Sequence, residues 1–358
     1  MRNLTLTMAG VLVAALAFAQ APAAPAPAGP APTGLVVGSG NFFSPIVGDL
    51  DAAVAFYRDG IGLDVQGAPA NADTNPALRN MFGLPDAQLR WLIGRPGGMR
   101  TGVEIVEISK ANGKPLTRRI QDHGAFTLVA FVRDLDATLG RLKTLRAPIL
   151  TPGGTAATVP FGGTQKAKLA VVQDPAGHFV ELVQPDQLPE SQAPPTSNVV
   201  QVRVRVTVQD AEKAARLYRD ALGMHESRPM GAFRKDPEVM TAFGLKGAEW
   251  RAAILEIPTT GLIFELIEFK GAGGRVVKGD IQDPGSTRIQ LQVRDVDATI
   301  AALKQAGGAV VSTGGATVEL PGRGGATTRV AIVRDPDNLF LVLLQAAAPA
   351  APAAPRPQ

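Results

Sequence analysis

The sequence contains no cysteine, and its 358 residues include only two tryptophans and two tyrosines. The absence of cysteine excludes disulfides, thiolate chemistry, thiolate metal sites and a lipidated cysteine at the N-terminus. An excess of one charge is also lacking: the net charge is +4, and lysine and arginine are dispersed among the acids, which argues against a nucleic-acid partner. Stability must therefore come from packing of the hydrophobic residues, which make up 45% of the chain.

Long apolar runs are scarce, and the one near the N-terminus has a specific pattern. It extends from Met8 to Phe18, follows the basic residue Arg2, and ends in Ala17-Phe18-Ala19, a small-x-small cleavage pattern. A membrane anchor is the alternative, but the run is shorter than the roughly 20 residues that span a bilayer. We predict a signal peptide over residues 1–19, export to the periplasm or the extracellular space, and no membrane insertion after cleavage.

Short motifs occur twice in the chain at a constant separation of 161 residues. Tyr57-Arg58-Asp59 returns as Tyr218-Arg219-Asp220, and Asp174-Pro175 returns as Asp335-Pro336. A fainter repeat lies within each copy, because Asp49-Leu50-Asp51-Ala52 resembles Asp134-Leu135-Asp136-Ala137. Repetition of this kind indicates a duplicated domain, with four similar modules in all.

Composition divides the chain around these copies. Ala, Pro and Gly dominate both ends, where the sequence cannot bury enough surface to fold, and a Pro-rich stretch separates the copies. We predict a spacer over residues 20–37, a first domain over 38–187, a linker over 188–197, a second domain over 198–345 and a disordered tail over 346–358.

Each module combines one helical pattern with several strand patterns. Asp49 and Asp210 stand where they can cap a helix, and apolar residues follow at helical spacing until a glycine ends each pattern. Strand patterns come next, and one pair is joined by the turn Asp174-Pro175-Ala176-Gly177 and its repeat Asp335-Pro336-Asp337-Asn338. The predicted module is β-α-β-β-β, which places the protein in the α+β class.

These residues resemble the vicinal oxygen chelate superfamily, which includes glyoxalase I, bleomycin-resistance proteins and extradiol dioxygenases. The resemblance covers nearly all of the two predicted domains. Its carriers are Gly48-Asp49-Leu50-Asp51, the segment from Asp174 to Leu182, and the segment from Phe264 to Phe269. It implies that paired modules curl their sheets into open barrels, so we expect four βαβββ modules in two glyoxalase-like domains, arranged as a pseudo-dimer within one chain.

The resemblance also implies where a divalent metal would bind, held by His or Gln on the first strand and Glu on the last strand of two modules. The last-strand positions correspond to Glu104, Glu181, Glu265 and Val342. The first-strand positions correspond to Phe42, Thr127, Arg203 and Arg288. Because none of these four is His or Gln, we expect no metal cofactor. If a divalent metal binds, Glu181 and Glu265 are its candidate ligands.

The three histidines lie away from the expected ligand positions. His178 belongs to a turn, His123 to a loop upstream of a strand, and His225 follows a helix end. We therefore expect structural or exposed roles for them.

Two ways of pairing the modules remain open from the sequence. If modules one and four share a site, it holds Phe42, Glu104, Arg288 and Val342, and modules two and three then assemble Thr127, Glu181, Arg203 and Glu265. If each domain closes its own site, Glu104 and Glu181 lack an arginine, whereas Glu265 lies between Arg203 and Arg288.

The arginines have two interpretations, and the chain has three functional hypotheses. Each arginine either neutralises a buried glutamate or offers bidentate recognition to a carboxylate or similar anion. We predict a protein that binds a small organic ligand without metal catalysis. The alternatives are a metal-dependent lyase or dioxygenase that uses Glu181 and Glu265, and a structural or interaction module with filled cavities.

Overall fold

The structure, a computed structural model, describes residues 34–69, 72–321 and 327–346 of the chain. The predicted signal peptide and most of the predicted spacer and tail lie outside the described residues. Within the described part, no helix is long and apolar enough to cross a membrane.

One sheet is built from the first and fourth modules. In the first module the elements are β2 (Ser44–Val47), α2 (Leu50–Ala55), β3 (Asp64–Val65), α3 (Pro76–Phe82), β4 (Gln88–Arg95) and β5 (Val103–Ser109). In the fourth they are β14 (Thr287–Val293), α7 (Val296–Gln305), β15 (Ala309–Val310), β16 (Val318–Pro321), β17 (Thr327–Arg334) and β18 (Phe340–Ala346). The strand order is β15-β17-β18-β14-β2-β5-β4-β3, so the join between modules is the antiparallel pair β14 and β2.

The second and third modules build the other sheet in the same way. The second module contains β6 (Phe126–Val132), α4 (Leu135–Thr144), β7 (Ala157–Pro160), β8 (Lys166–Gln173) and β9 (Phe179–Pro185). The third contains β10 (Val199–Thr207), α5 (Ala211–Arg216), β11 (His225–Arg228), α6 (Pro237–Ala242), β12 (Glu249–Ile257) and β13 (Leu262–Lys270). Antiparallel pairing of β10 with β6 joins the modules in the order β11-β12-β13-β10-β6-β9-β8-β7.

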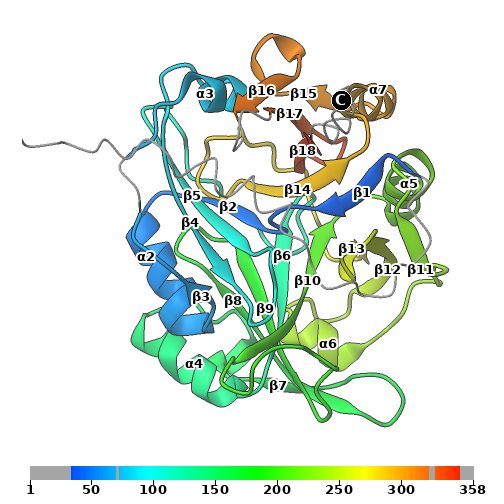
Figure 1. The fold of residues 1–358 in the computed structure, drawn as a ribbon. Helices are drawn as coiled ribbons and strands as arrows, with labels where there is room; N and C mark the ends of the chain where they lie inside the picture. The colour runs from blue at the N-terminus through cyan, green and yellow to red at the C-terminus, as the bar shows by residue number, and fades with distance from the viewer. Residues whose placement is uncertain (1–33, 70–71, 322–326, 347–358) are drawn as a thin grey trace, which may run out of the picture.

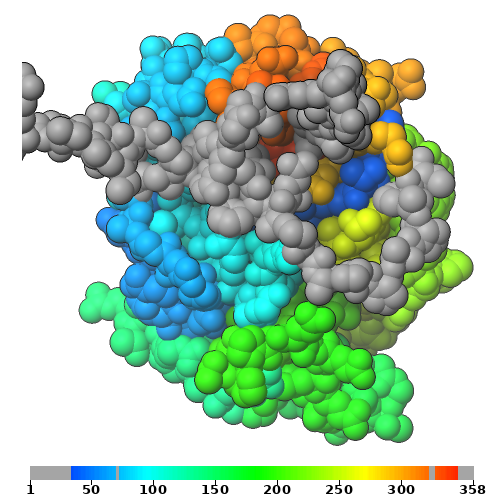
Figure 2. All heavy atoms as spheres, viewed as in Figure 1, coloured from blue at the N-terminus to red at the C-terminus, as the bar shows by residue number. Residues whose placement is uncertain are grey.

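The cross-pairing of modules is visible in the colours of Figure 1. Blue and cyan strands of the first module lie beside orange and red strands of the fourth, and green strands of the second lie beside yellow-green strands of the third. On the surface shown in Figure 2, α3 borders the fourth module, and the contacts of α3 with β16 and β17 agree with this view. The structure thus has the first of the two pairings left open by the sequence.

An aspartate opens each of the four modular helices, and Asp49 and Asp210 cap theirs as predicted. Asp49, Asp134, Asp210 and Asp295 each have an extended backbone, and each side chain accepts a hydrogen bond from a backbone N–H in the first helical turn. Such caps satisfy donors that a helix leaves free at its start. The helices α2 and α5 widen into π-helical turns over Phe56–Ile61 and Leu217–Ala221, which complete the predicted helical patterns.

One predicted boundary is wrong at the start of the first domain. The spacer was expected to reach residue 37, but β1 (Val36–Ser39) pairs antiparallel with β14. Val36 is fully buried, and its N–H donates to the carbonyl of Leu222 in the third module. These contacts place the segment against both the third and the fourth modules.

The described residues form three hydrophobic clusters. The largest includes residues from all four modules, among them Tyr57, Leu128, Phe264 and Leu341. The two smaller clusters lie on the opposite faces of the sheets, one built from modules one and four and the other from modules two and three. Each sheet therefore has one face toward the common core and one face toward its own cluster, where the candidate sites lie.

Candidate functional site

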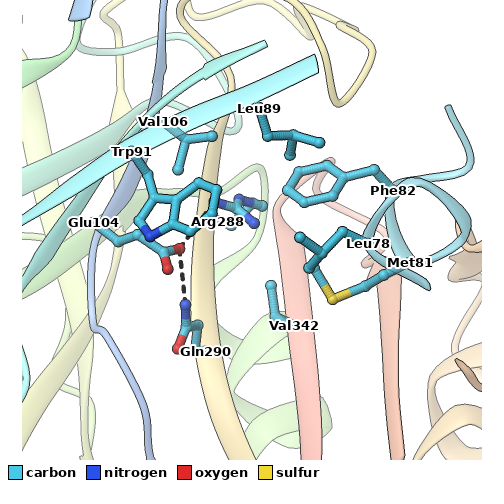
Figure 3. Close-up of a pocket in the computed structure, with 10 residues that line it drawn as sticks. All are labelled: Leu78, Met81, Phe82, Leu89, Trp91, Glu104, Val106, Arg288, Gln290 and Val342. Atoms are coloured by element: carbon cyan, nitrogen blue, oxygen red, sulfur yellow. Dashed lines mark hydrogen bonds and ion pairs between the residues drawn. The ribbon is translucent and has the colours of Figure 1, made fainter. Parts of the chain in front are cut away.

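A cavity opens on the face of the first sheet that carries its own hydrophobic cluster. Its volume is about 40 Å³, and a buried water needs roughly 10–15 Å³, so it has room for about three waters or a group of similar size. The lining comes from α3, β4, β5, β14 and β18, as Figure 3 shows: Leu78, Met81, Phe82, Leu89, Trp91, Glu104, Val106, Arg288, Gln290 and Val342. We call this space the first cavity.

An ion pair across the module boundary forms the polar end of the first cavity. Nη2 of Arg288, on β14, donates to Oε2 of Glu104, on β5, over 3.0 Å. The same oxygen accepts a hydrogen bond from Nε2 of Gln290 over 2.9 Å and one from Oγ of Ser44 over 3.3 Å. Three donors from two modules thus hold one carboxylate oxygen, and Figure 3 shows two of them, Arg288 and Gln290.

Arg288 is almost completely enclosed. Its side chain is 2% exposed, and its guanidinium lies over the ring of Phe82 with 4.7 Å between the guanidinium carbon and the ring centroid. Burial lowers the pKa of Arg288, and the charge of Glu104 opposes this change. The Nε atom of Arg288 is buried without a hydrogen-bond partner among the described residues. The first cavity therefore contains a fixed cation with unused donor capacity.

The second sheet places a different charged group at the equivalent region. Arg205, on β10, bonds Glu265 through Nε over 2.8 Å and Glu181 through Nη1, so one guanidinium bridges both carboxylates. Arg203 approaches Glu265 at 3.5 Å, and its side chain is 33% exposed, against 14% for Arg205. We call Arg203, Arg205, Glu181 and Glu265 the second cluster.

The two glutamates of the second cluster differ in electrostatics. Burial raises the pKa of Glu181, and Glu265 adds to that effect, while Arg205 opposes it. Burial alone would also raise the pKa of Glu265, but Arg205 and Arg203 together hold it below its ordinary value. The pKa of Arg205 is raised, because the two carboxylates outweigh its burial.

The repeat allows the two sites to be compared position by position. Phe243 and Glu265 stand 161 residues after Phe82 and Glu104, so the aromatic wall and one carboxylate are common to both. In place of Arg288 and Gln290 the second sheet has Thr127 and Val129, and its arginines lie on the other first strand. Duplicated scaffolds thus present one ion pair beside a cavity and one bridged cluster.

The structure brings some of the predicted site residues together and separates others from them. Glu104, Arg288 and Val342 come together in the first cavity, and Glu181 and Glu265 come together in the second cluster, with buried Thr127 opposite Arg205 in the strand pair. The prediction that Phe42 belongs to this site is wrong, because Phe42 is fully buried in the common core and does not line the first cavity. The strand β2 begins only at Ser44, whose hydroxyl reaches Glu104 instead.

The structure also corrects the role predicted for Arg203. The predicted first-strand position falls on Arg203, yet Arg205 makes the close contacts with both glutamates. Because alternate residues of a strand share a face, the residue two positions further along was an equal candidate. The same rule would have identified Gln290 and Ser44, which were missed. The helix α3 was also missed, although Asn75 and Pro76 give a cap and a first-turn proline.

Each sequence copy also has a buried tyrosine that bonds a buried aspartate of its other module, and the surroundings of the two pairs differ. Tyr57 donates to Asp174 over 3.0 Å, and Tyr218 donates to Asp335 over 2.6 Å. His178 lies beside Asp174, with Nδ1 2.9 Å from its Oδ2 and Nε2 2.9 Å from the carbonyl of Ser286. The expected turn role of His178 fits these contacts, which link the second and fourth modules.

The donor sets of both sites are poorly suited to a divalent metal. A permanently charged guanidinium lies within hydrogen-bond distance of Glu104, and another bridges Glu181 and Glu265. A dication that approached these carboxylates would be repelled by a cation that cannot lose its proton. The carbonyl oxygen of Gln290 already accepts a hydrogen bond from Asn41. The residues present therefore do not fit the metal that the resemblance implied.

Comparisons with known proteins agree with the fold. A model of the Glyoxalase/Bleomycin resistance protein/Dioxygenase superfamily matches residues 41–182 and 200–343. Glyoxalase I from Zea mays is similar in structure, with a TM-score of 0.54 and 19% identity over 85% of this chain and 92% of that chain. A Bacillus subtilis protein described as a "putative dioxygenase" has a TM-score of 0.50 and 13% identity over 88% and 87% of the two chains. No curated protein matches the sequence. At such identities the structural likeness shows the fold alone.

Proposed function

Since the chain belongs to the Glyoxalase/Bleomycin resistance protein/Dioxygenase superfamily, whose model matches most of it in two copies, we propose that it binds a small organic molecule in the first cavity without a metal. The observation that carries this proposal is the Arg288–Glu104 pair, with Gln290 beside it, at the end of a cavity whose other lining residues are apolar. Small-molecule sites typically combine apolar walls with a few fixed polar groups.

The fixed polar groups are held from both modules, which supports a preorganised site. Glu104 accepts hydrogen bonds from Ser44 on β2 and from Arg288 and Gln290 on β14, so its side chain has little conformational freedom. Phe82 lies against the guanidinium on the side of α3. Groups fixed in this way lose little conformational entropy when a ligand binds.

The two tryptophans provide a test of ligand binding. Trp91 lines the first cavity, whereas Trp250 packs against the hydrophobic cluster of the second sheet, and its Nε1 donates to Asp236. A library of small organic compounds would be screened by thermal shift and by fluorescence of the Trp250→Phe variant, which reports Trp91 alone. The proposal predicts compounds that raise the melting temperature and change the emission of Trp91.

A cavity-filling variant gives the matched control. Leu89 lines the first cavity, and its repeat position is Trp250, so this place in the strand accommodates tryptophan. Leu89→Trp should fold but lose the compounds that stabilise the wild type. Compounds that bind Leu89→Trp as well as the wild type would show that the first cavity is not the ligand site.

Metal titration tests the other part of the proposal. Melting curves with Zn²⁺, Mn²⁺, Ni²⁺ and Fe²⁺, together with elemental analysis of the purified protein, should show no stoichiometric metal. A metal content of one per chain that disappears in Glu181→Gln or Glu265→Gln would support a metal-dependent lyase or dioxygenase instead.

A further inference from the structure

The charge of the first cavity restricts the kind of ligand it accepts. Arg288 and Glu104 form a closed pair whose charges cancel, and no other charged side chain lines the cavity among the described residues. A ligand that carried a charge would leave that charge uncompensated beside a 2% exposed arginine. Burying an unpaired charge is far more costly than burying a hydrogen-bonded neutral group.

The ion pair nevertheless leaves one donor and one acceptor for a ligand. On the arginine, Nε is buried without a partner among the described residues, while Nη2 is engaged with Glu104. On the glutamate, Oε2 accepts the hydrogen bonds from Arg288, Gln290 and Ser44. Among the described residues, these are the hydrogen bonds to this carboxylate, and none of them goes to Oε1. Its Oε1 therefore keeps its capacity to accept.

Building on the proposed function, we infer that the first cavity selects an uncharged ligand headed by a carboxamide-type group, with a carbonyl acceptor next to an N–H donor. The carbonyl accepts from Arg288, and the amide N–H donates to Oε1 of Glu104. A carboxamide head has few heavy atoms and fits a cavity of about 40 Å³. Because the head fills this space, the apolar body of the ligand projects from the opening of the cavity.

Three probes of nearly equal shape test this inference on the intact protein at pH 7. Benzamide is neutral, benzoate is an anion and benzamidine is a cation, so only their charge and hydrogen-bonding pattern differ. Binding is measured by calorimetry and by Trp91 emission in the Trp250→Phe background. We expect benzamide to bind at least about tenfold more tightly than either ion, a difference that corresponds to roughly 1.4 kcal/mol.

A charge-changing variant predicts a switch of preference. Glu104→Gln leaves Arg288 without its counter-charge, so benzoate should gain on benzamide by about tenfold or more. Glu107→Gln is the matched control, because Glu107 lies on the same strand and also pairs with an arginine, Arg90 at 3.3 Å, outside the cavity lining. The control should keep the preference of the wild type.

The outcomes separate this inference from the proposal on which it rests. If benzoate or benzamidine binds the wild type as tightly as benzamide, and Leu89→Trp blocks that binding, the cavity binds ligands but the inference is wrong. If none of the three probes binds, the inference is also wrong, and the compound library decides separately whether the cavity binds anything. The order of the probes on the wild type decides the matter even if Glu104→Gln does not fold.

Discussion

Arg203 and Arg205 lie two residues apart on β10, but their surroundings differ. Arg205 bonds two buried glutamates, whereas Arg203 is one-third exposed and 3.5 Å from its nearest carboxylate. Its guanidinium also lies 5.0 Å from the ring centroid of Phe131. Removing one partner of a buried ion pair destabilises a protein strongly, whereas removing a partly exposed and more distant partner costs less.

We therefore predict that Arg205→Met lowers the free energy of unfolding by about 3 kcal/mol or more. Arg203→Met, the matched control on the same strand, should change it by less than about 1 kcal/mol. Urea denaturation measures both. Replacing Glu181 and Glu265 by Gln in the Arg205→Met background should recover much of the loss. Equal costs for the two arginines would contradict the bridging role assigned to Arg205.

The two buried aspartates predict different pH dependences. Burial raises the pKa of Asp335 to about 7, and the neighbouring Asp337 adds to this effect although Tyr218 opposes it. Burial would also raise the pKa of Asp174, but His178 and the hydrogen bonds to that carboxylate hold the pKa below its ordinary value. His178 has no counterpart at the repeat position, which is Leu339.

The sign of the Asp335 effect follows from linkage. The folded-state pKa lies above the unfolded value, so the folded protein binds the proton more tightly and loses stability as the pH rises through about 7. Asp335→Asn removes this loss. Its stability relative to the wild type should therefore rise by about 2–4 kcal/mol between pH 5 and pH 9, as measured by urea denaturation across that range.

Asp174→Asn is the control for this pH series. Because the pKa of Asp174 is lowered in the folded state, its carboxylate stabilises the fold above its unfolded pKa and loses that effect only in acid. Asp174→Asn should thus destabilise the protein by a nearly constant amount from pH 5 to pH 9. A parallel response of the two variants would contradict the assignment.

At the scale of elements, α3 links the first cavity to the module boundary. It contributes Leu78, Met81 and Phe82 to the lining and ends at Gly83, which has a left-handed φ of 68°. A Cβ atom at Gly83 would lie 2.4 Å from the carbonyl oxygen of Val311, in the fourth module. The helix end is therefore fitted closely against the partner module.

The repeat supplies a control for a mutation at this helix end. Gly244 also has a left-handed φ, 73°, but a Cβ there would meet no atom within 4 Å. Gly244→Ala should cost about 1–2 kcal/mol from backbone strain alone. Gly83→Ala should cost clearly more and should weaken ligand binding, because α3 must shift away from Val311. If urea denaturation gives the same loss of stability for both variants, the contact between Gly83 and Val311 can adjust without displacing α3.

The elements that sequence patterns identify well are those fixed by local chemistry. The helix starts at Asp49, Asp134, Asp210 and Asp295 depend on a capping side chain within one turn, and the Asp-Pro turns depend on four consecutive residues. For the same reason the β-α-β-β-β order and the α+β class could be predicted. Short helices such as α3 lack a long periodic pattern, and they were not predicted.

Contacts between modules could not be derived in the same way. The first strands β2, β6, β10 and β14 have similar patterns, so nothing local tells which of them pair. Which arginine bridges the two glutamates depends on where the strand begins. It also depends on whether Arg203 or Arg205, two residues apart on one face of β10, lies closer to Glu181 and Glu265. Glu104, Arg288, Glu181 and Glu265 could be proposed from the family pattern. Strand alternation makes Arg205, Gln290 and Ser44 candidates as well, but only the three-dimensional pairing shows that they contact the glutamates.

For the whole molecule, the pairing of modules crosses the boundary between the two sequence copies. Each sheet takes one module from each copy, and the largest hydrophobic cluster includes residues of all four modules. Extended segments also cross between the copies: His123 bridges to Val276, and the N–H of Leu116 donates to the carbonyl of Pro284. Neither copy has its sheet complete by itself.

Separated copies should therefore depend on each other. Residues 34–187 and 198–346 expressed as two chains should be poorly folded or self-associated alone, and mixing should give a 1:1 complex that unfolds cooperatively. Light scattering after gel filtration measures the stoichiometry, and circular dichroism measures the fold. Two monomeric, independently cooperative halves would contradict the cross-paired arrangement.

The cross-pairing has a consequence for how the two sites can evolve. In a symmetric dimer of identical chains, any substitution alters both sites at once, so a change that benefits one binding site is imposed on the other. Fusion of the two copies into one chain removes this coupling while the same modules still face each other. One site is then free to specialise for a ligand while the other accumulates substitutions that stabilise the fold. The different arginine arrangements of the two sheets are the kind of divergence that such independence permits.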